Sequence, residues 1–276
     1  MASSLTPILV LGAFAALYAG VRWFEWSQTF RPSRRMEADP TLAGLPCENV
    51  IFYAEDGVRL NGWWIPCDDA RGTILYCHGN AGNISTRLDV LAGLHSLGVN
   101  VFVFDYRGYG LSKGIPSEQG LYRDARAAYE VVRARYEDAE QPPVIVYGAS
   151  LGGAVAANLA CERPARGLVI EGGFTSSIDV GERWFPLLPI RAIARYRFDT
   201  RGRVSGLSIP KLFAHSSVDR VIPYDIGGEL YKAAAAPKHF VPLNGEHGEA
   251  GWLDTPLFLD ELRRFVAENL PVEPGP

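Results

Sequence analysis

The residues best suited to chemistry lie in a short stretch, 147–153, where Ser150 stands in the pattern G-x-S-x-G between Gly148 and Gly152. An apolar run, 144–146, precedes the pattern, and an alanine-rich, helix-forming segment follows it. In a tight turn from strand to helix, a serine is held clear of the sheet, and glycines leave room for that turn. The first N–H groups of the following helix then lie where an oxyanion would form. This context predicts Ser150 as a nucleophile.

Two further residues follow in an order that suits acyl transfer: Asp219 and then His247. A serine hydroxyl is a weak nucleophile unless a base removes its proton. Neutral His247 can act as that base, while Asp219 fixes the histidine tautomer and stabilises the imidazolium. We therefore predict a catalytic triad of Ser150, Asp219 and His247.

The segment 78–83, His-Gly-Asn-Ala-Gly-Asn, follows a strand that we expect near the centre of the sheet. Its glycines let the backbone approach a ligand closely. We predict that the backbone N–H groups of Asn80 and Leu151 form an oxyanion hole. His78 is predicted to order its loop, and Asp105 and Arg107 to hold a loop near the site.

Each of these assignments has a structural alternative. Ser150 would fit a glycine-rich turn required only for tight packing, and His247 would fit the surface. Asp219 would fit a capping position in a loop, which leaves Glu171 and Asp225 as the next carboxylates for the acid role.

These side chains must be positioned by strand ends, and short apolar runs alternate with helical patterns along the chain. The predicted strands are 50–54, 58–65, 73–77, 100–105, 143–147, 167–171, 210–214 and 239–243. The predicted helices are 84–97, 118–136, 151–163, 224–235 and 256–269. Unalternated apolar strands are typical of sheets covered on both faces. An antiparallel start followed by β-α units predicts an α/β fold with an open, mostly parallel, doubly wound sheet.

The composition fits one large domain, because 276 residues with 47% hydrophobic side chains can bury a substantial core. A net charge of -4 gives no reason to expect nucleic acid as a partner. The four cysteines lack the spacing of a zinc site, so no metal is expected, and we expect free thiols that are mostly buried.

The N-terminal residues 1–26 are predicted to form a transmembrane anchor, followed by a linker over 27–46 and a catalytic domain over 47–276. No charged side chain occurs before Arg22, and Trp23 and Trp26 suit a membrane interface. The arginines that follow predict a single-pass protein whose catalytic domain is cytoplasmic. A cleaved signal peptide is the rival interpretation, which the absence of early Lys or Arg disfavours. An amphipathic helix is disfavoured by the lack of a polar face.

Several motifs together resemble the small membrane-anchored α/β-hydrolase-domain (ABHD-type) proteins, over roughly residues 50–270. The matching segments are 78–83, Asp-Tyr-Arg-Gly-Tyr-Gly at 105–110, Pro-Ser-Glu at 116–118, 148–153, and Asp-Arg-Val-Ile-Pro at 219–223. The resemblance implies an α/β-hydrolase fold and serine-hydrolase chemistry on ester or thioester bonds, without metal or organic cofactor. The family includes lipid hydrolases and protein depalmitoylases. Ser216 departs from the family pattern, which often has glycine there.

A cap insertion is expected over 174–209, between two predicted strands. Phe174, Trp184, Phe185 and Leu188 are predicted to bind substrate, since they offer apolar surface to an acyl chain; packing of the cap onto the core is the alternative. The insertion also carries six arginines against three acidic residues, which suits anionic lipid headgroups or a solvated charge cluster.

The sequence thus predicts a membrane-anchored serine hydrolase, an esterase or thioesterase, acting on acyl-containing small molecules, lipids or lipidated proteins beside a bilayer. An aminopeptidase-like or amidase activity is the alternative within the same chemistry. A non-catalytic membrane scaffold is the alternative of a different class, because a fold does not fix a function.

Overall fold

The computed structural model describes residues 5–136, 139–248 and 256–270, with side chains described from residue 10 onward. Its strands are β1 (Arg31–Pro32), β2 (Glu48–Tyr53), β3 (Arg59–Ile65), β4 (Thr73–Cys77), β5 (Ala81–Gly82), β6 (Asn100–Asp105), β7 (Val144–Ala149), β8 (Gly167–Glu171), β9 (Lys211–Ser216) and β10 (Lys238–Leu243). Its helices are α1 (Leu5–Thr29), α2 (Leu88–His95), α3 (Glu118–Arg133), α4 (Leu151–Glu162), α5 (Ser177–Trp184), α6 (Ile190–Ile193), α7 (Thr200–Val204), α8 (Tyr224–Ala233) and α9 (Pro256–Asn269).

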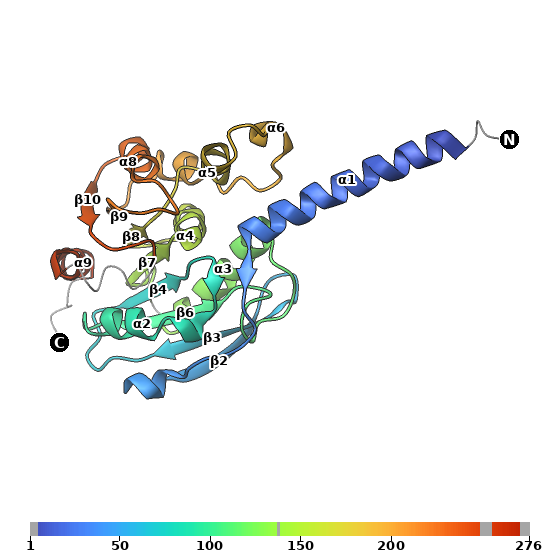
Figure 1. Cartoon of the computed structure of the whole chain (residues 1–276). Helices are drawn as coiled ribbons and strands as arrows, with labels where there is room; N and C mark the ends of the chain where they lie inside the picture. The colour runs from blue at the N-terminus through green and yellow to red at the C-terminus, as the bar shows by residue number, and fades with distance from the viewer. Residues whose placement is uncertain (1–4, 137–138, 249–255, 271–276) are drawn as a thin grey trace.

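Eight strands form one sheet in the order β10, β9, β8, β7, β4, β6, β3, β2 (Figure 1). The pairs β2–β3 and β3–β6 are antiparallel, and every other neighbouring pair in this sheet is parallel. The predicted antiparallel start and mostly parallel remainder are therefore confirmed. All the parallel strands end at one edge, which is where ligands bind in open α/β sheets.

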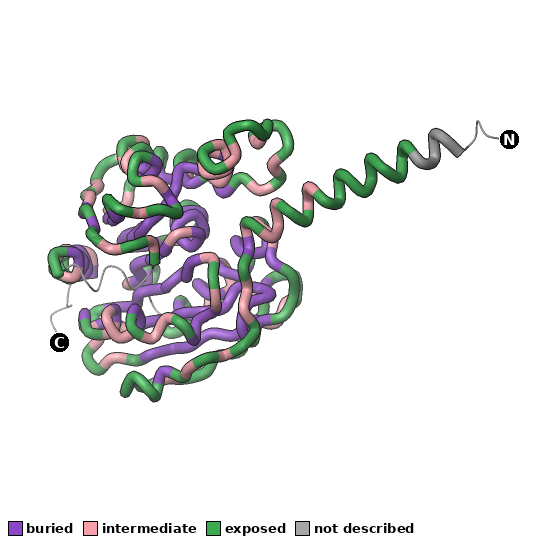
Figure 2. The backbone as a smooth tube through the Cα atoms, viewed as in Figure 1, coloured by how far each residue is buried: buried purple, intermediate pink, exposed green. Residues whose placement is uncertain are grey.

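Helices cover both faces of the sheet, as the unalternated apolar strands predict. Along β4, Leu75 and Cys77 join the core cluster beneath α3 and α4, whereas Ile74 and Tyr76 join the cluster that contains side chains of α2 and α9. Successive strand residues point to opposite faces, so one short strand serves both cores. Figure 2 shows the central strands buried along most of their length, whereas the edge strands β2 and β10 are more exposed.

The predicted helix over 84–97 differs from the structure in its first turn. Residues 84–86 form a 3-10 turn, and α2 begins only at Leu88. The side chain of Asn83 caps the 3-10 turn by accepting from the backbone N–H of Ser85 at 2.9 Å. This local hydrogen bond offers the backbone an alternative to an α-helical start.

The predicted anchor over 1–26 forms most of α1, which projects from the domain in Figure 1. Within the part of the chain that the structure describes, no helix has both the length and the apolar character needed to cross a membrane. The predicted spanning anchor is therefore not confirmed. Residues 1–4 of that prediction lie outside the described residues. The helix also continues past the predicted boundary at Trp26, and its last turns, with Arg22 and Glu25, contact the domain.

The four cysteines are unpaired, but the expectation that most are buried is wrong. Only Cys77 is buried, in the central strand β4, while Cys47 and Cys67 are half-buried and Cys161 is exposed. Cys161 lies near the end of α4, at a position that is exposed to solvent.

Arg107 holds the loop after β6 through two carboxylates, as predicted for this residue. Its guanidinium donates to Asp124 of α3 at 2.8 Å and to Asp56 of the β2–β3 turn at 2.8 Å. The Asp124 side chain is completely buried. The arginine thus compensates a carboxylate that has no access to water.

We expect Arg107→Ala to lower the free energy of unfolding by about 3 to 5 kcal/mol, because it removes the cationic partner of the buried Asp124 and leaves only the backbone N–H of residue 107. Urea denaturation measures this change. Arg133→Ala is the matched control, since Arg133 pairs with Glu130 at the surface with its side chain 56% exposed. A loss no larger than that of the control would contradict the prediction.

Candidate active site

The turn between β7 and α4 holds Ser150 in a strained backbone conformation. Ser150 has φ 52° and ψ -117°, which L-residues rarely adopt. A Cβ added at Gly148 would lie 2.2 Å from the carbonyl oxygen of Gly152, and one added at Gly152 would lie 1.9 Å from that of Cys77. Only glycine fits at these two positions, so helix α4 can begin directly against the neighbouring strand β4.

The strained turn leaves the Ser150 hydroxyl available. Ser150 occupies the N-cap position of α4, yet its side chain makes no capping hydrogen bond there. A serine at this position normally accepts from an N–H group of the first helical turn. Its own backbone N–H donates instead to the Glu171 carbonyl at 2.8 Å, which fixes the turn against β8.

The structure brings Ser150, His247 and Asp219 together at the carboxyl edge of the sheet. The Oγ atom of Ser150 lies 2.9 Å from His247 Nε2, and His247 Nδ1 lies 2.6 Å from Asp219 Oδ2. An ionised carboxylate only accepts hydrogen bonds, so Nδ1 carries the proton and Nε2 is left to accept from the serine hydroxyl. This is the geometry that a serine nucleophile with a histidine base requires.

Asp219 is held in place by its own loop. Its Oδ1 accepts from the backbone N–H groups of Val221 and Ile222, each at 2.8 Å. Burial raises the pKa of Asp219, but its hydrogen bonds to His247 and to these N–H groups outweigh burial and hold the pKa below its usual value. His215, on β9, donates to the Ile222 carbonyl at 2.8 Å and lies 3.5 Å from Asp219 Oδ2. The carboxylate is therefore charged, oriented and buried.

Asn80 and Leu151 both line the pocket that contains Ser150. Leu151 is the first residue of α4, so its N–H lies in the first turn, where no helical acceptor exists. Within the described residues, neither the N–H of Asn80 nor that of Leu151 donates to another group. The Asn80 side chain is fixed, because its Oδ1 accepts from the Arg31 backbone N–H and from the Tyr109 hydroxyl. Both N–H groups are thus free to bind an oxyanion.

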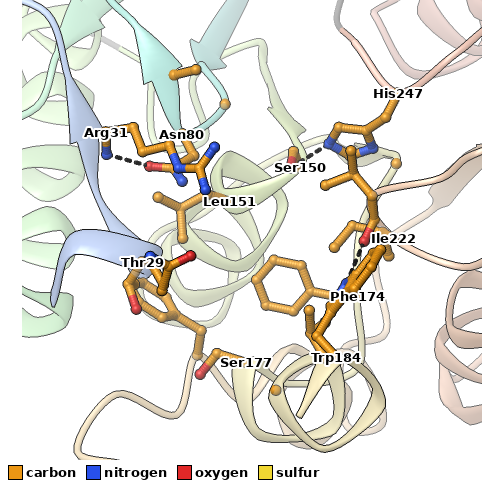
Figure 3. Close-up of a pocket in the computed structure, with 18 of the residues that line it drawn as sticks. Thr29, Arg31, Asn80, Ser150, Leu151, Phe174, Ser177, Trp184, Ile222 and His247 are labelled. Carbon is orange, nitrogen blue, oxygen red and sulfur yellow. Dashed lines mark hydrogen bonds between the residues drawn. The ribbon is translucent and has the colours of Figure 1, made fainter. Parts of the chain in front are cut away.

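A pocket of about 730 Å³ opens beside Ser150. All four residues predicted to bind substrate line it: Phe174, Trp184, Phe185 and Leu188. Figure 3 shows Phe174 and Trp184 on one side of the pocket, below His247. Trp184 also donates its indole N–H to the Val221 carbonyl at 3.0 Å, which connects the cap to the loop of Asp219.

The sequence analysis missed one wall of this pocket, which comes from the end of α1 and the segment after it. These residues had been assigned to the anchor and linker. They are Val21, Arg22, Phe24, Glu25, Gln28, Thr29 and Arg31. The available signal was the pair of opposite charges three residues apart at the end of an apolar segment, which suits contact with a folded domain better than contact with lipid.

Relatives of this chain identify its family. An uncharacterized protein of Mycobacterium tuberculosis is 37% identical over 270 residues, which are 95% of this chain and 95% of that protein. An α/β-hydrolase domain-containing protein of Arabidopsis thaliana is 34% identical over 222 residues, 74% of this chain and 72% of that protein. The chain is an α/β hydrolase. The family described as serine aminopeptidase, S33, matches residues 68–197 of this hydrolase.

Solved structures agree with the α/β-hydrolase fold. An esterase of Pyrococcus furiosus superposes with a TM-score of 0.72 at 19% identity, over 87% of this chain and 99% of that one. The esterase domain of a Rhodothermus marinus protein superposes with a TM-score of 0.61 at 23% identity, over 80% of this chain and all of that one. At these identities the likeness shows the fold alone, and the predicted α/β-hydrolase fold is confirmed.

Near the loop that contains Asn80, this α/β hydrolase buries His78 and Asp105. His78 Nε2 lies 3.7 Å from Asp105 Oδ1, which also accepts from the Ile84 backbone N–H at 3.0 Å. Burial raises the pKa of Asp105 to about 7 and lowers the pKa of His78 to about 3. Both groups are therefore neutral in weak acid, and Asp105 holds the end of the loop as a protonated carboxyl.

We expect this carboxyl to make folding stability dependent on pH. In the unfolded chain an aspartate ionises near pH 3.9, so the stability contributed by protonated Asp105 is complete below about pH 4. It is lost as the pH rises to about 7. Relative to Asp105→Asn, whose side chain is always neutral, the wild type should lose up to about 1.4 kcal/mol per pH unit across this window.

Urea denaturation at a series of pH values measures this difference. The asparagine retains an oxygen that can accept from Ile84. The matched control is Asp89→Asn, a substitution at an exposed carboxyl. Parallel curves for the wild type and Asp105→Asn between pH 4 and pH 7 would be evidence against a raised pKa.

Proposed function

We propose that this α/β hydrolase is a serine hydrolase that cleaves acyl ester or thioester bonds through an acyl-enzyme. The observation that carries the proposal is the hydrogen-bonded series from Ser150 to His247 to Asp219, at 2.9 and 2.6 Å, beside a largely apolar pocket. The strained backbone of Ser150 and the absence of a capping hydrogen bond from its hydroxyl both support a catalytic role over a packing role.

The chemistry follows from this arrangement. His247 Nε2 takes the hydroxyl proton as Ser150 Oγ attacks the acyl carbon, and the N–H groups of Asn80 and Leu151 stabilise the oxyanion. The protonated His247 then gives its proton to the leaving alcohol or thiol, and the acyl group stays on Ser150. Water, activated by the same histidine, releases the acid and restores the serine. Asp219 stays ionised throughout and stabilises the imidazolium.

We propose acyl chains of lipids or lipidated proteins as the substrates. Phe174, Phe185 and Leu188 line the pocket and offer apolar contact to a chain. Trp184 adds an aromatic face from the cap. The Arabidopsis relative carries only a domain name, so the substrate class rests on the pocket alone.

A lipid bilayer as partner and a cytoplasmic position for the domain stay predictions from the sequence. The basic character of the cap is one support for the bilayer. The structure weakens this support, because Arg191 and Arg201 pair with acidic residues of the cap itself, Glu182 and Asp179.

A fluorophosphonate probe tests the serine. We expect it to label the wild type and not Ser150→Ala, because only an activated hydroxyl attacks the phosphorus. Gel fluorescence measures the labelling, and Ser176→Ala, which removes a buried serine that caps α5 rather than one beside His247, is the control that should still be labelled. Absence of labelling in the wild type, or equal labelling of the wild type and Ser150→Ala, would contradict the proposal and favour a non-catalytic scaffold.

An amidase or aminopeptidase-like activity is the second candidate, favoured by the match to the family described as serine aminopeptidase. An aminopeptidase must bind a free amino group, for which an acidic side chain in the pocket is suited. Glu246 lines the pocket and is exposed, whereas Glu25 is engaged with Arg22 and the cap.

Because the pocket is mainly apolar, we expect p-nitrophenyl acyl esters to be cleaved at least about tenfold faster than aminoacyl p-nitroanilides of matched size. Initial rates at equal concentrations measure the ratio. Faster cleavage of the anilides, together with loss of that activity in Glu246→Gln, would replace the esterase assignment with the aminopeptidase one.

A further inference from the structure

The end of α1 forms a wall of the pocket that faces the cap. Val21, Phe24 and Gln28 lie one turn apart along the helix, and all three line the pocket. Phe24 meets Phe185 of the cap edge to face, with ring centroids 5.6 Å apart. In Figure 3, Thr29, the last residue of α1, and Trp184 lie on opposite sides of the pocket, while Ser150 and His247 lie at its other end. The pocket therefore extends from the nucleophile into the space between α1 and the cap.

A charged pair fastens this wall to the cap. Glu25 Oε1 accepts from the backbone N–H groups of Arg195 and Tyr196 at 2.6 and 2.9 Å. Arg22 forms an ion pair with Glu25 at 2.9 Å and donates to the carbonyl of Ile193. Both ends of one cap segment are thus held by a single turn of α1.

Aromatic side chains fix the same end of α1 to both the core and the cap. Trp26 donates its indole N–H to the Pro116 carbonyl at 3.1 Å. Phe30, directly after the helix, is 1% exposed and packs edge to face on Tyr196 and Phe198. The wall is therefore anchored to the core on one side and to the cap on the other.

Beside this charged pair, the wall also offers apolar side chains to a ligand. Arg22 and Glu25 pair with each other and with backbone groups of the cap, so their charges are already engaged within the protein. Gln28, Thr29 and Arg31 add polar atoms to this side of the pocket, and Val21 and Phe24 supply its apolar surface. A chain of methylene groups is the ligand that gains most from such a surface.

We propose that the inner side of α1 is the acyl-chain site of this hydrolase, and that Val21 and Phe24 determine which chain lengths it accepts. The inference rests on the proposed ester hydrolysis and adds the place where the chain binds. The acyl carbonyl lies at Ser150, and the chain extends away from the sheet between α1 and the cap.

The test compares kcat/KM for p-nitrophenyl esters from acetyl to dodecanoyl. Phe24→Ala removes a wall contact, and Val21→Trp fills the space that the chain would occupy. Each should lower kcat/KM for the dodecanoyl ester about tenfold, Phe24→Ala by loss of apolar contact and Val21→Trp by blocking the chain. The acetyl ester, which does not reach α1, should change by less than about twofold.

Phe14→Ala is the matched control, since it makes the same change on the same helix at a side chain that is 66% exposed and outside the pocket. It should leave the whole chain-length profile unchanged. A merely structural role for α1 would lower all esters equally.

The outcomes distinguish this inference from the proposed ester hydrolysis on which it rests. A fall in kcat/KM for the dodecanoyl ester but not the acetyl ester in Phe24→Ala and Val21→Trp, with Phe14→Ala like the wild type, would support the acyl-chain site. If the wild type cleaves esters but the two pocket variants keep its profile, or lose all esters in parallel, the inference is overturned and ester hydrolysis stands. A wild type that cleaves no ester overturns both.

Discussion

The close approach of α4 to β4 is the constraint on which the site depends. Gly152 lies so near the Cys77 carbonyl that no side chain fits between them. Because the helix can start there, the first helical N–H, at Leu151, lies close to the loop that leaves β4. The same constraint forces Ser150 into its positive φ, and this conformation turns the hydroxyl away from the helix and toward His247. The Ser150 hydroxyl and the Leu151 N–H are thus placed by one backbone contact.

The loop that leaves β4, residues 78–83, is held in turn by the segment that follows α1. The strands β1 and β5 pair in parallel, with Arg31 opposite Ala81. Asn80 accepts from the Arg31 backbone, and the Asn83 side chain donates to the carbonyl of Ser33 at 3.1 Å. A segment that the sequence suggested as a linker therefore belongs to the architecture of the site. It also directly follows α1, the helix that forms one wall of the pocket.

The strand positions, the mostly parallel sheet and the meeting of three distant side chains could be predicted because each has a local signature. Apolar runs define strands, and glycines around Ser150 define the turn. The role of the N-terminal segment could not be predicted in the same way. Val21 and Phe24 are apolar whether they face lipid, a cap or a ligand, and only the tertiary contacts of Arg22 and Glu25 distinguish these surroundings. The start of α2 was misplaced for a related reason, because the Asn83 side chain competes with helix formation over a single turn.

The hydrogen bond from the Trp184 indole to the Val221 carbonyl has a mechanical consequence. Val221 is also one of the two residues whose N–H groups orient Asp219. A cap that swings outward must either break the indole bond or drag the peptide units flanking Val221 with it. In the second case the carboxylate shifts relative to the imidazole, so this single hydrogen bond links the position of the cap to that of Asp219.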